Sequence, residues 1–515
     1  MSGIAGLFGG ATLAGLRRLA RPLDARGPGA RWEGVHAGAG FLVVRSGPAE
    51  DGPAVAVVHD RLVAVAGHAL NRLALAREFD LPDDSGVAAV FGELVQFVGP
   101  EAASARLTGC VSTAVWDPAR GEAFLRREAS GLRGLEWVRT PDGFAFSTDG
   151  RALAVAGFAQ GTDAAALAEA VRGGAPVAPR GSYRGVERLP PGGAWWGGRA
   201  GTVPAPLPPH PGGAGGNRER WLRSVRYGLE LAAVSRVRAA GPTAIALSDG
   251  LASAALLACR APGARPEVAL VVDAAEAAVA EARAVAMGLR VRRVSLSGEA
   301  FAELLDELPM SPAMLQPEAW LWAALARGAW LEGATGLLAG CGASLGFDPP
   351  ESGLRAGLRG LLVRDTAEVG PPGSPLPNDV AAPLEPWAQL TEVELAGFDA
   401  GCAAFGVAPI APFADLAVMR VAREVPSGVH HGGGRRALLA SIASAGGVSV
   451  GPAAPRRPTL PLAEWLGKLD ADTLPDQLAH VLDAAHVRAV VAGGRAGDPA
   501  QLRRAVVYGL LARLG

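Results

Sequence analysis

Short apolar segments separated by turns dominate the first part of the chain, up to about residue 197. Two helical stretches lie among them, at residues 71–79 and 88–97, where apolar side chains recur at helical spacing. The expected strands are residues 3–9, 40–45, 54–59, 61–66, 112–116, 123–126 and 143–147. Alternating strands and helices with many hairpin signals predict an α+β sandwich for this region.

A different pattern begins at about residue 220, where helical stretches alternate with single apolar strands. Strands are expected at 245–247, 268–272, 291–296 and 336–339, and helices at 221–240, 275–287, 301–308 and 318–332. This β-α alternation predicts a doubly wound parallel sheet, which binds ligands in a crevice at the carboxyl ends of its strands. Residues 353–386 are predicted to be mostly loop, and the C-terminal third is predicted to be helical, with one helix at 462–469.

A Pro/Gly-rich segment separates the two patterns. Residues 204–216 read Pro-Ala-Pro-Leu-Pro-Pro-His-Pro-Gly-Gly-Ala-Gly-Gly, a composition typical of a connector. The chain is therefore predicted to contain an N-terminal domain (residues 1–197), a linker (198–219) and a second domain (220–515).

Composition and charge narrow the function classes. The 515 residues carry 49 Lys and Arg against 50 Asp and Glu, which gives no electrostatic basis for binding nucleic acid or a membrane surface. The four cysteines are far apart and show no CxxC spacing, as suits a reducing compartment. No apolar run reaches the roughly twenty residues of a membrane span. We therefore expect a cytoplasmic protein, and no metal-ligating residues are predicted.

The strongest candidate for chemistry is the junction between the strand at 245–247 and the helix after it. Ser248-Asp249-Gly250 is a tight turn, and an Ala/Leu-rich helix begins at Leu251. Such a junction brings backbone N–H groups and the positive end of a helix to one point, which suits a phosphate. The expected ligand-binding positions are Leu247, Ser248, Asp249, Gly250, Leu251 and Ser253, with Gly340 and Gly342 in a second loop after the fourth strand.

Both loops resemble those of the asparagine synthetase family. The positions that match its pyrophosphate loop, Ser-Gly-Gly-(Leu/Ile)-Asp-Ser-Ser, are Ser248, Gly250, Leu251 and Ser253. Asp249 stands where that family has Gly, and Ala252 stands where it has a metal-binding Asp; in the second loop, Ser344 and Leu345 replace an acidic pair. The resemblance implies a site for ATP and Mg²⁺, and Mg²⁺ prefers carboxylate oxygens. Binding of both is therefore expected to be weakened, unless Asp249 or Asp348 supplies a shifted carboxylate.

The N-terminal region is similar to the glutaminase domain of the same family, which has an N-terminal nucleophile (Ntn) fold. The shared motifs are Gly3-Ile-Ala-Gly6, Arg26-Gly27-Pro28, Leu107-x-Gly109, Trp116-Asp117, Arg127-Glu128-x-x-Gly131, Phe146-Ser147 and Arg188 to Gly192. Where the family has a nucleophilic cysteine and an oxyanion-stabilising Asn-Gly pair, this chain has Ser2 and Ala66-Gly67. A thiolate is far more nucleophilic than a hydroxyl near neutral pH, and a lost oxyanion donor costs about 10²–10³ in rate. The resemblance therefore implies a glutaminase-like domain without glutaminase activity.

The family also uses a lysine to stabilise charge on the reacting acyl-adenylate and pyrophosphate. The matching turn here carries Arg456 and Arg457, and Lys468 lies further on in a predicted helix as an exposed side chain. Arginine can neutralise a phosphate but does not transfer a proton as a lysine would. With Ser2 as a degenerate nucleophile position, these two arginines are the candidate catalytic residues. Asp415, in a match to the family's Pro-(Phe/Tyr)-Leu-Asp, is expected to cap a helix.

The end of the chain, residues 479–514, is similar to that of the lasso-peptide macrolactam synthetases, a branch of this family. Two functions remain open. In one, the protein is a pseudoenzyme of peptide natural-product biosynthesis that binds a precursor peptide or a partner enzyme. In the other, it is an active AMP-forming synthetase that adenylates a carboxylate and couples it to an internal amine. The changes at Ser2, Ala252 and Ser344 favour the pseudoenzyme.

Overall fold

The computed structural model describes residues 2–27, 29–46, 52–173, 175–176, 178–197, 199–200, 217–259, 263–274, 277–347, 389–425, 436–450, 459–479 and 482–514. Most of the predicted linker and all of the predicted loop at 353–386 lie outside these residues. The same is true of Asp348, Arg456 and Arg457.

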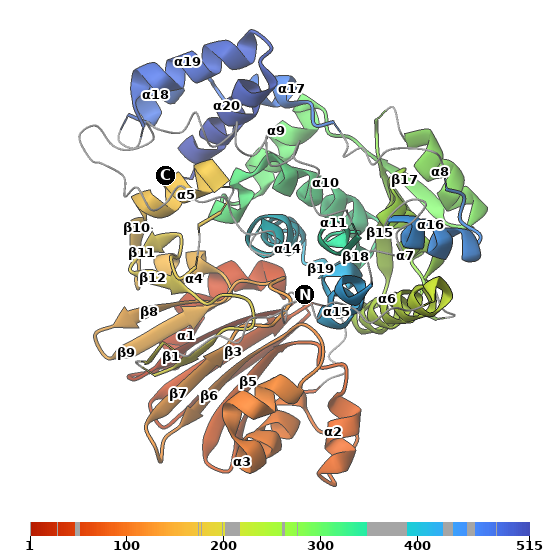
Figure 1. Ribbon diagram of the computed structural model, residues 1–515. Helices are drawn as coiled ribbons and strands as arrows, with labels where there is room; N and C mark the ends of the chain where they lie inside the picture. The colour runs from red at the N-terminus through yellow and green to blue at the C-terminus, as the bar shows by residue number, and fades with distance from the viewer. Residues whose placement is uncertain are drawn as a thin grey trace.

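Two six-stranded antiparallel sheets form the N-terminal sandwich (Figure 1). The first has the order β12-β8-β9-β1-β3-β2. Its strands are β12 Val186–Arg188, β8 Glu136–Thr140, β9 Gly143–Ser147, β1 Ser2–Phe8, β3 Ala39–Arg45 and β2 Ala30–His36. The second has the order β14-β13-β7-β6-β5-β4. Its strands are β14 Arg199–Ala200, β13 Ala194–Trp196, β7 Glu122–Arg126, β6 Val111–Asp117, β5 Arg61–Gly67 and β4 Val55–Val58.

The core between the sheets is apolar because alternate residues of each strand face it. Ile4 and Phe8 of β1 belong to this core, while Ala5 and Leu7 face the opposite side. That outer side is covered by α1 Leu13–Ala20, η1 Arg21–Arg26 and α4 Gly150–Val155, and the second sheet is covered by α2 Arg72–Glu78 and α3 Val87–Arg106. The predicted sandwich and its seven strands are confirmed. The other five strands were not predicted: charged and polar side chains interrupt the apolar pattern of β2 and β8, and β12, β13 and β14 are only two or three residues long.

A five-stranded parallel sheet in the order β17-β16-β15-β18-β19 forms the centre of the second domain. The strands are β15 Thr243–Ala246, β16 Val268–Val272, β17 Arg290–Val294, β18 Gly336–Leu338 and β19 Ala408–Ile410. The helices between them are α7 Leu251–Ala258, α8 Ala277–Ala286, α9 Gly298–Glu307 and α10 Pro317–Leu331, with α6 Arg218–Ala240 ahead of the sheet. The chain runs outward from β15 to β17 and then returns to place β18 on the other side of β15. This is the predicted doubly wound sheet, and its switch point lies between β15 and β18.

Helices complete the second domain. They are α11 Ala343–Phe347, the π-helix η4 Gln389–Glu394, α14 Leu395–Ala403, η5 Pro412–Ala414, α15 Leu416–Glu424, α16 Arg436–Ala445, α17 Leu462–Leu466, α18 Leu474–Gln477, α19 Ala484–Arg495 and α20 Pro499–Ala512. Lys468 lies just past α17 and pairs with exposed Glu299 at 3.3 Å, in agreement with the surface position predicted for it. Among the described residues, no helix is both long and apolar enough to cross a membrane.

Candidate functional site

The first loop closes on itself through two serine hydroxyls. Ser253 Oγ accepts the N–H of Ser248 at 3.2 Å and lies 3.1 Å from Ser248 Oγ. Ser248 Oγ in turn accepts the N–H of Gly250 at 3.1 Å. A serine at each end of the turn therefore holds its shape. Leu247 stays part of the sheet, because its N–H donates to the carbonyl of Leu270 at 2.9 Å.

The serine hydroxyls leave other N–H groups of the loop available. Within the described parts of the chain, no group accepts the backbone N–H of Asp249, Leu251 or Ala252. The last two belong to the first turn of α7, where N–H groups have no partner inside the helix. These free donors, at the positive end of a helix, suit an anion.

The second loop packs directly against the first. A Cβ atom on Gly340 would lie 3.0 Å from the Cβ of Ala252, a tight contact that any larger residue would relieve only by moving the first loop. Gly342 has a φ of +87°, and a Cβ there would lie 3.2 Å from the backbone nitrogen of Ala414. Its N–H donates to Glu394 Oε1 at 2.9 Å. The structure therefore brings the predicted residues of both loops together, and it adds Glu394, which the sequence did not indicate.

Ser2, the predicted nucleophile position, belongs to the N-terminal domain and is fully buried. Like Ile4 and Phe8 it occupies an even position of β1, and its neighbour on β3 is Arg45. No described group forms a hydrogen bond with Ser2 Oγ. Arg45 is also buried; it donates to the carbonyl of Gly67 at 2.9 Å and lies over the ring of Trp32 at 5.3 Å.

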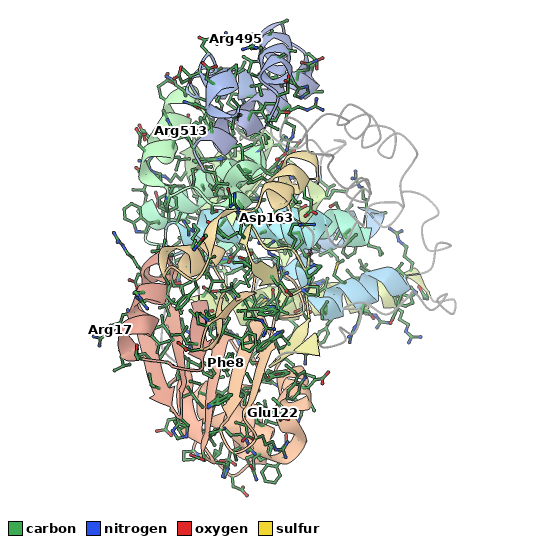
Figure 2. The ribbon with its side chains drawn as sticks, turned by 90° about the vertical axis from the view of Figure 1, so that its left-hand side faces the viewer. Phe8, Arg17, Glu122, Asp163, Arg495 and Arg513 are labelled. Carbon is green, nitrogen blue, oxygen red and sulfur yellow. The ribbon has the colours of Figure 1, made fainter. Side chains whose placement is uncertain are left out.

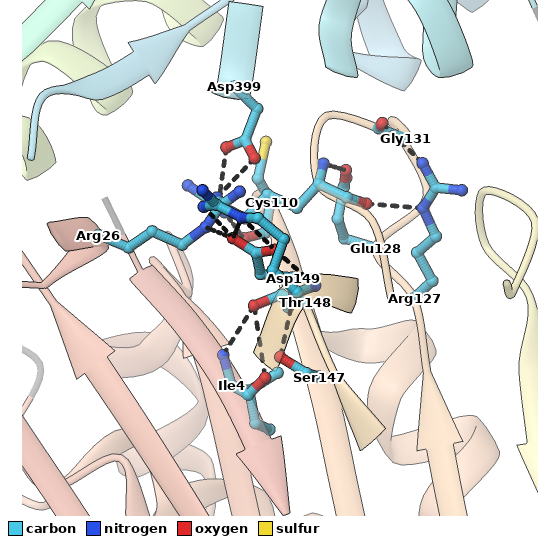
Figure 3. Close-up of polar contacts among 12 residues, drawn as sticks. Ile4, Arg26, Cys110, Arg127, Glu128, Gly131, Ser147, Thr148, Asp149 and Asp399 are labelled. Atoms are coloured by element: carbon cyan, nitrogen blue, oxygen red, sulfur yellow. Dashed lines mark hydrogen bonds and ion pairs between the residues drawn. The ribbon is translucent and has the colours of Figure 1, made fainter. Parts of the chain in front are cut away.

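Buried ion pairs join the two domains. Arg127 and Arg188 of the N-terminal domain donate to Glu392 of η4 at 2.7 and 2.8 Å. Burial alone raises the pKa of the Glu392 carboxyl, but the two guanidinium groups outweigh it and hold this pKa below its usual value. Arg26 donates to Asp399 of α14 at 2.6 Å (Figure 3). The N-terminal domain thus supplies the counter-charges for two buried carboxylates of the second domain.

Asp149 belongs to the same buried cluster, within the N-terminal domain (Figure 3). Its carboxylate accepts from Arg151 and lies 3.9 Å from Arg26 Nε. Burial opposes ionisation, but the charges of Arg151 and Arg26 lower the pKa of Asp149 to about 2.

Asp415 caps α15, as predicted, because its carboxylate accepts the N–H of Ala417 at 2.8 Å. It also pairs with the partly buried guanidinium of Arg236. Within the described residues, no group of three His, Cys, Asp or Glu side chains is arranged to hold a metal ion.

Residues 1–205 match the family model of a glutamine amidotransferase domain. The N-terminal domain is of the glutamine amidotransferase type. No curated protein matches the chain in sequence. Similar solved structures include glutamine phosphoribosylpyrophosphate amidotransferase from B. subtilis in complex with ADP and GMP, at 13% identity and a TM-score of 0.30. Another, described as the allosteric regulatory enzyme of purine biosynthesis, has 11% identity and the same TM-score.

Each of these two comparisons covers 57% of this chain and 65% of the other, so this chain spans just under two thirds of their length. Similarity this low does not indicate an activity. The function of the amidotransferase-type domain and of the parallel-sheet domain is therefore inferred from their own residues.

Proposed function

We propose that this chain is a pseudoenzyme of the asparagine synthetase family, of the lasso-peptide macrolactam synthetase branch. Its amidotransferase-type domain does not hydrolyse glutamine, and its parallel-sheet domain keeps a backbone site for phosphate with weakened binding of ATP and Mg²⁺. It acts by binding a precursor peptide or a partner biosynthetic enzyme in the cytoplasm.

The contact between Ala252 and Gly340 carries this proposal. It brings the two loops together at the place where the family resemblance expects carboxylates to hold Mg²⁺. At the two positions in question, Ala252 offers only a methyl group and Ser344 only a neutral hydroxyl, while the nearby Glu394 carboxylate already accepts the N–H of Gly342 at 2.9 Å. Mg²⁺ requires hard oxygen ligands, most often carboxylates, so these residues do not fit the ion.

The amidotransferase-type domain supports the same conclusion. Ser2 is buried beside Arg45, and Ala66 offers no side-chain donor for an oxyanion. We infer that the domain persists because the second domain needs its arginines: without Arg127 and Arg188, Glu392 would be a buried charge without a counter-ion.

A second function remains open because of Asp249. Its carboxylate lies in the turn beside the free N–H groups, on a half-buried residue, and no ion pair within the described chain occupies it. If Asp249 held the metal from this shifted position, the protein would be an active ATP-dependent macrolactam- or amide-forming synthetase.

Pyrophosphate release separates the two functions. The full-length protein would be incubated with ATP and Mg²⁺, with and without peptides that carry a free carboxylate and an amine. We expect no release above a control without protein. Sustained release that requires both ATP and Mg²⁺ would support the active synthetase and would contradict the pseudoenzyme.

A further inference from the structure

Arg283 of α8 is a buried cation placed directly behind the first loop. Only 2% of its surface is exposed, and it shares the inward face of the helix with Ala277, Ala280 and Ala284. Its Nη1 donates to the carbonyl of Ser248 at 3.0 Å and lies 3.4 Å from that of Gly250. Its Nε donates to the carbonyl of Ser449 at 2.9 Å.

All of these partners are neutral. No carboxylate within the described residues comes within ion-pairing distance of Arg283, although the Asp249 charge acts on it from further away. Burial lowers the pKa of its guanidinium, and Asp249 only partly offsets this effect. Burying a cation without a counter-charge is unfavourable, and elsewhere in this protein buried arginines such as Arg127 and Arg188 face carboxylates. An anionic ligand beside the loop would supply the counter-charge that Arg283 lacks.

Arg283 helps to fix the direction of the loop's N–H groups, together with the Ser253 hydroxyl, which contacts the same two carbonyls, and the Ala254 N–H, which donates to that of Gly250. In a planar trans peptide the C=O and N–H point to opposite sides. Because the carbonyls of Ser248 and Gly250 point toward Arg283, the N–H groups of Asp249 and Leu251 point away from it, into the side that the serine hydroxyls leave free.

We propose that Arg283 is the positioning residue of a metal-independent binding site for the phosphate groups of a nucleotide at the start of α7. It turns the N–H groups of Asp249 and Leu251 toward the phosphate and contributes a fixed positive charge behind the loop. The ligand class is a di- or triphosphate, for which pyrophosphate is the simplest probe. This inference rests on the phosphate site of the proposed function.

The test is calorimetric titration of the full-length protein with pyrophosphate, without Mg²⁺, at several NaCl concentrations. Arg283→Met removes both the charge and the planar guanidinium that donates to the loop carbonyls, whereas Arg283→Lys keeps only the charge. Arg495→Met is the matched control, since Arg495 ends α19, which Figure 1 shows well away from α8, and forms an exposed pair with Asp472 (Figure 2). Asp249→Asn removes a negative charge from the turn that carries the free N–H groups.

We expect Arg283→Met to weaken pyrophosphate binding about tenfold or more and to flatten its dependence on NaCl. Arg283→Lys should keep the NaCl dependence of the wild type with intermediate affinity, whereas a merely structural role would give both variants the same loss. Arg495→Met should bind as the wild type does. Asp249→Asn should bind about two- to fivefold more tightly.

Wild-type affinity and salt dependence in folded Arg283→Met would overturn the role of Arg283 and leave the proposed function intact. If Arg283→Met does not fold, the other two variants decide. The role of Arg283 would be overturned if Arg283→Lys lost the NaCl dependence of pyrophosphate binding, or if Asp249→Asn bound pyrophosphate no more tightly than the wild type. A wild type that binds no pyrophosphate at all would overturn both this inference and the phosphate site of the proposed function.

Discussion

The boundary between the two domains and the two loops, 248–253 and 340–342, differ in where they carry acidic side chains. At the boundary, Glu392 and Asp399 are buried, and each is met by arginines of the amidotransferase-type domain. At the loops, the positions where the family resemblance expects carboxylates carry Ala252 and Ser344, and the acidic side chains of Asp249 and Glu394 stand at other positions. The boundary thus pairs its carboxylates with arginines, whereas the loops have neutral side chains where the metal-dependent chemistry of that family would need charge.

The largest effect should follow from removing a charge at the boundary. Glu392→Ala leaves Arg127 and Arg188 buried without their shared carboxylate, which typically costs about 3–5 kcal/mol. Urea unfolding of the full chain measures the loss. Glu303→Ala is the control, because Glu303 pairs with Arg327 at the surface and such pairs contribute about 0–1 kcal/mol. A loss no larger than that of the control would mean that the boundary charges are not needed for folding.

The next effect concerns glutamine. We expect no ammonia release from wild type, since Ser2 is buried and Ala66 provides no oxyanion donor. Ser2→Cys alone should also stay inactive, because a missing oxyanion donor costs about 10²–10³ in rate, and only addition of Ala66→Asn could restore turnover. The assay is ammonia release compared with Ser2→Ala. Clear activity from Ser2→Cys alone would show that another group of the domain stabilises the oxyanion.

A smaller effect is expected from acid. The pKa of Asp149 is about 2 in the folded protein and about 4 when unfolded, so the group stabilises the fold above pH 4. This stabilisation is lost as the pH falls from about 4 toward 2. The difference of almost two units between the folded and unfolded pKa values corresponds to about 2 kcal/mol of unfolding free energy. Glu392, whose pKa is also lowered, acts in the same direction.

Urea unfolding between pH 6 and pH 3 would measure this loss. Asp149→Asn should be less stable at neutral pH and should show a shallower decline in acid, whereas Asp472→Asn, which removes an exposed carboxylate, should follow the wild type. Identical acid profiles for wild type and Asp149→Asn would contradict the assignment.

The architecture could be predicted because its signals are local. Alternating apolar segments at 112–116 and 123–126 and the regular β-α alternation after residue 220 became strands and helices close to their expected bounds. The two loops could also be placed, since parallel strands present their carboxyl ends at one edge.

The charges at the boundary could not be predicted. Arg127 and Glu392 are 265 positions apart, and Arg26 and Asp399 are 373 apart, so no local pattern joins them. The burial of Ser2 follows from the position of β1 inside its sheet, which is covered on both faces, and a run of small residues does not reveal this. Arg283 did leave a signal, a charged residue on the apolar face of an alanine-rich helix. The prediction for Arg456 and Arg457 lies outside the described residues.

Restoring the lost carboxylates tests the central claim most directly. ATP would be titrated by calorimetry, with and without Mg²⁺, into the wild type and into the double variant Ala252→Asp, Ser344→Asp. The wild type should bind ATP weakly and almost equally with and without Mg²⁺, because backbone N–H groups need no metal. The double variant should bind ATP in a Mg²⁺-dependent way, since one new carboxylate would stand at position 252, which meets Gly340, and the other at position 344, shortly after Gly342. Tight, Mg²⁺-dependent binding of ATP by the wild type would contradict the account and identify Asp249 or Asp348 as a metal ligand.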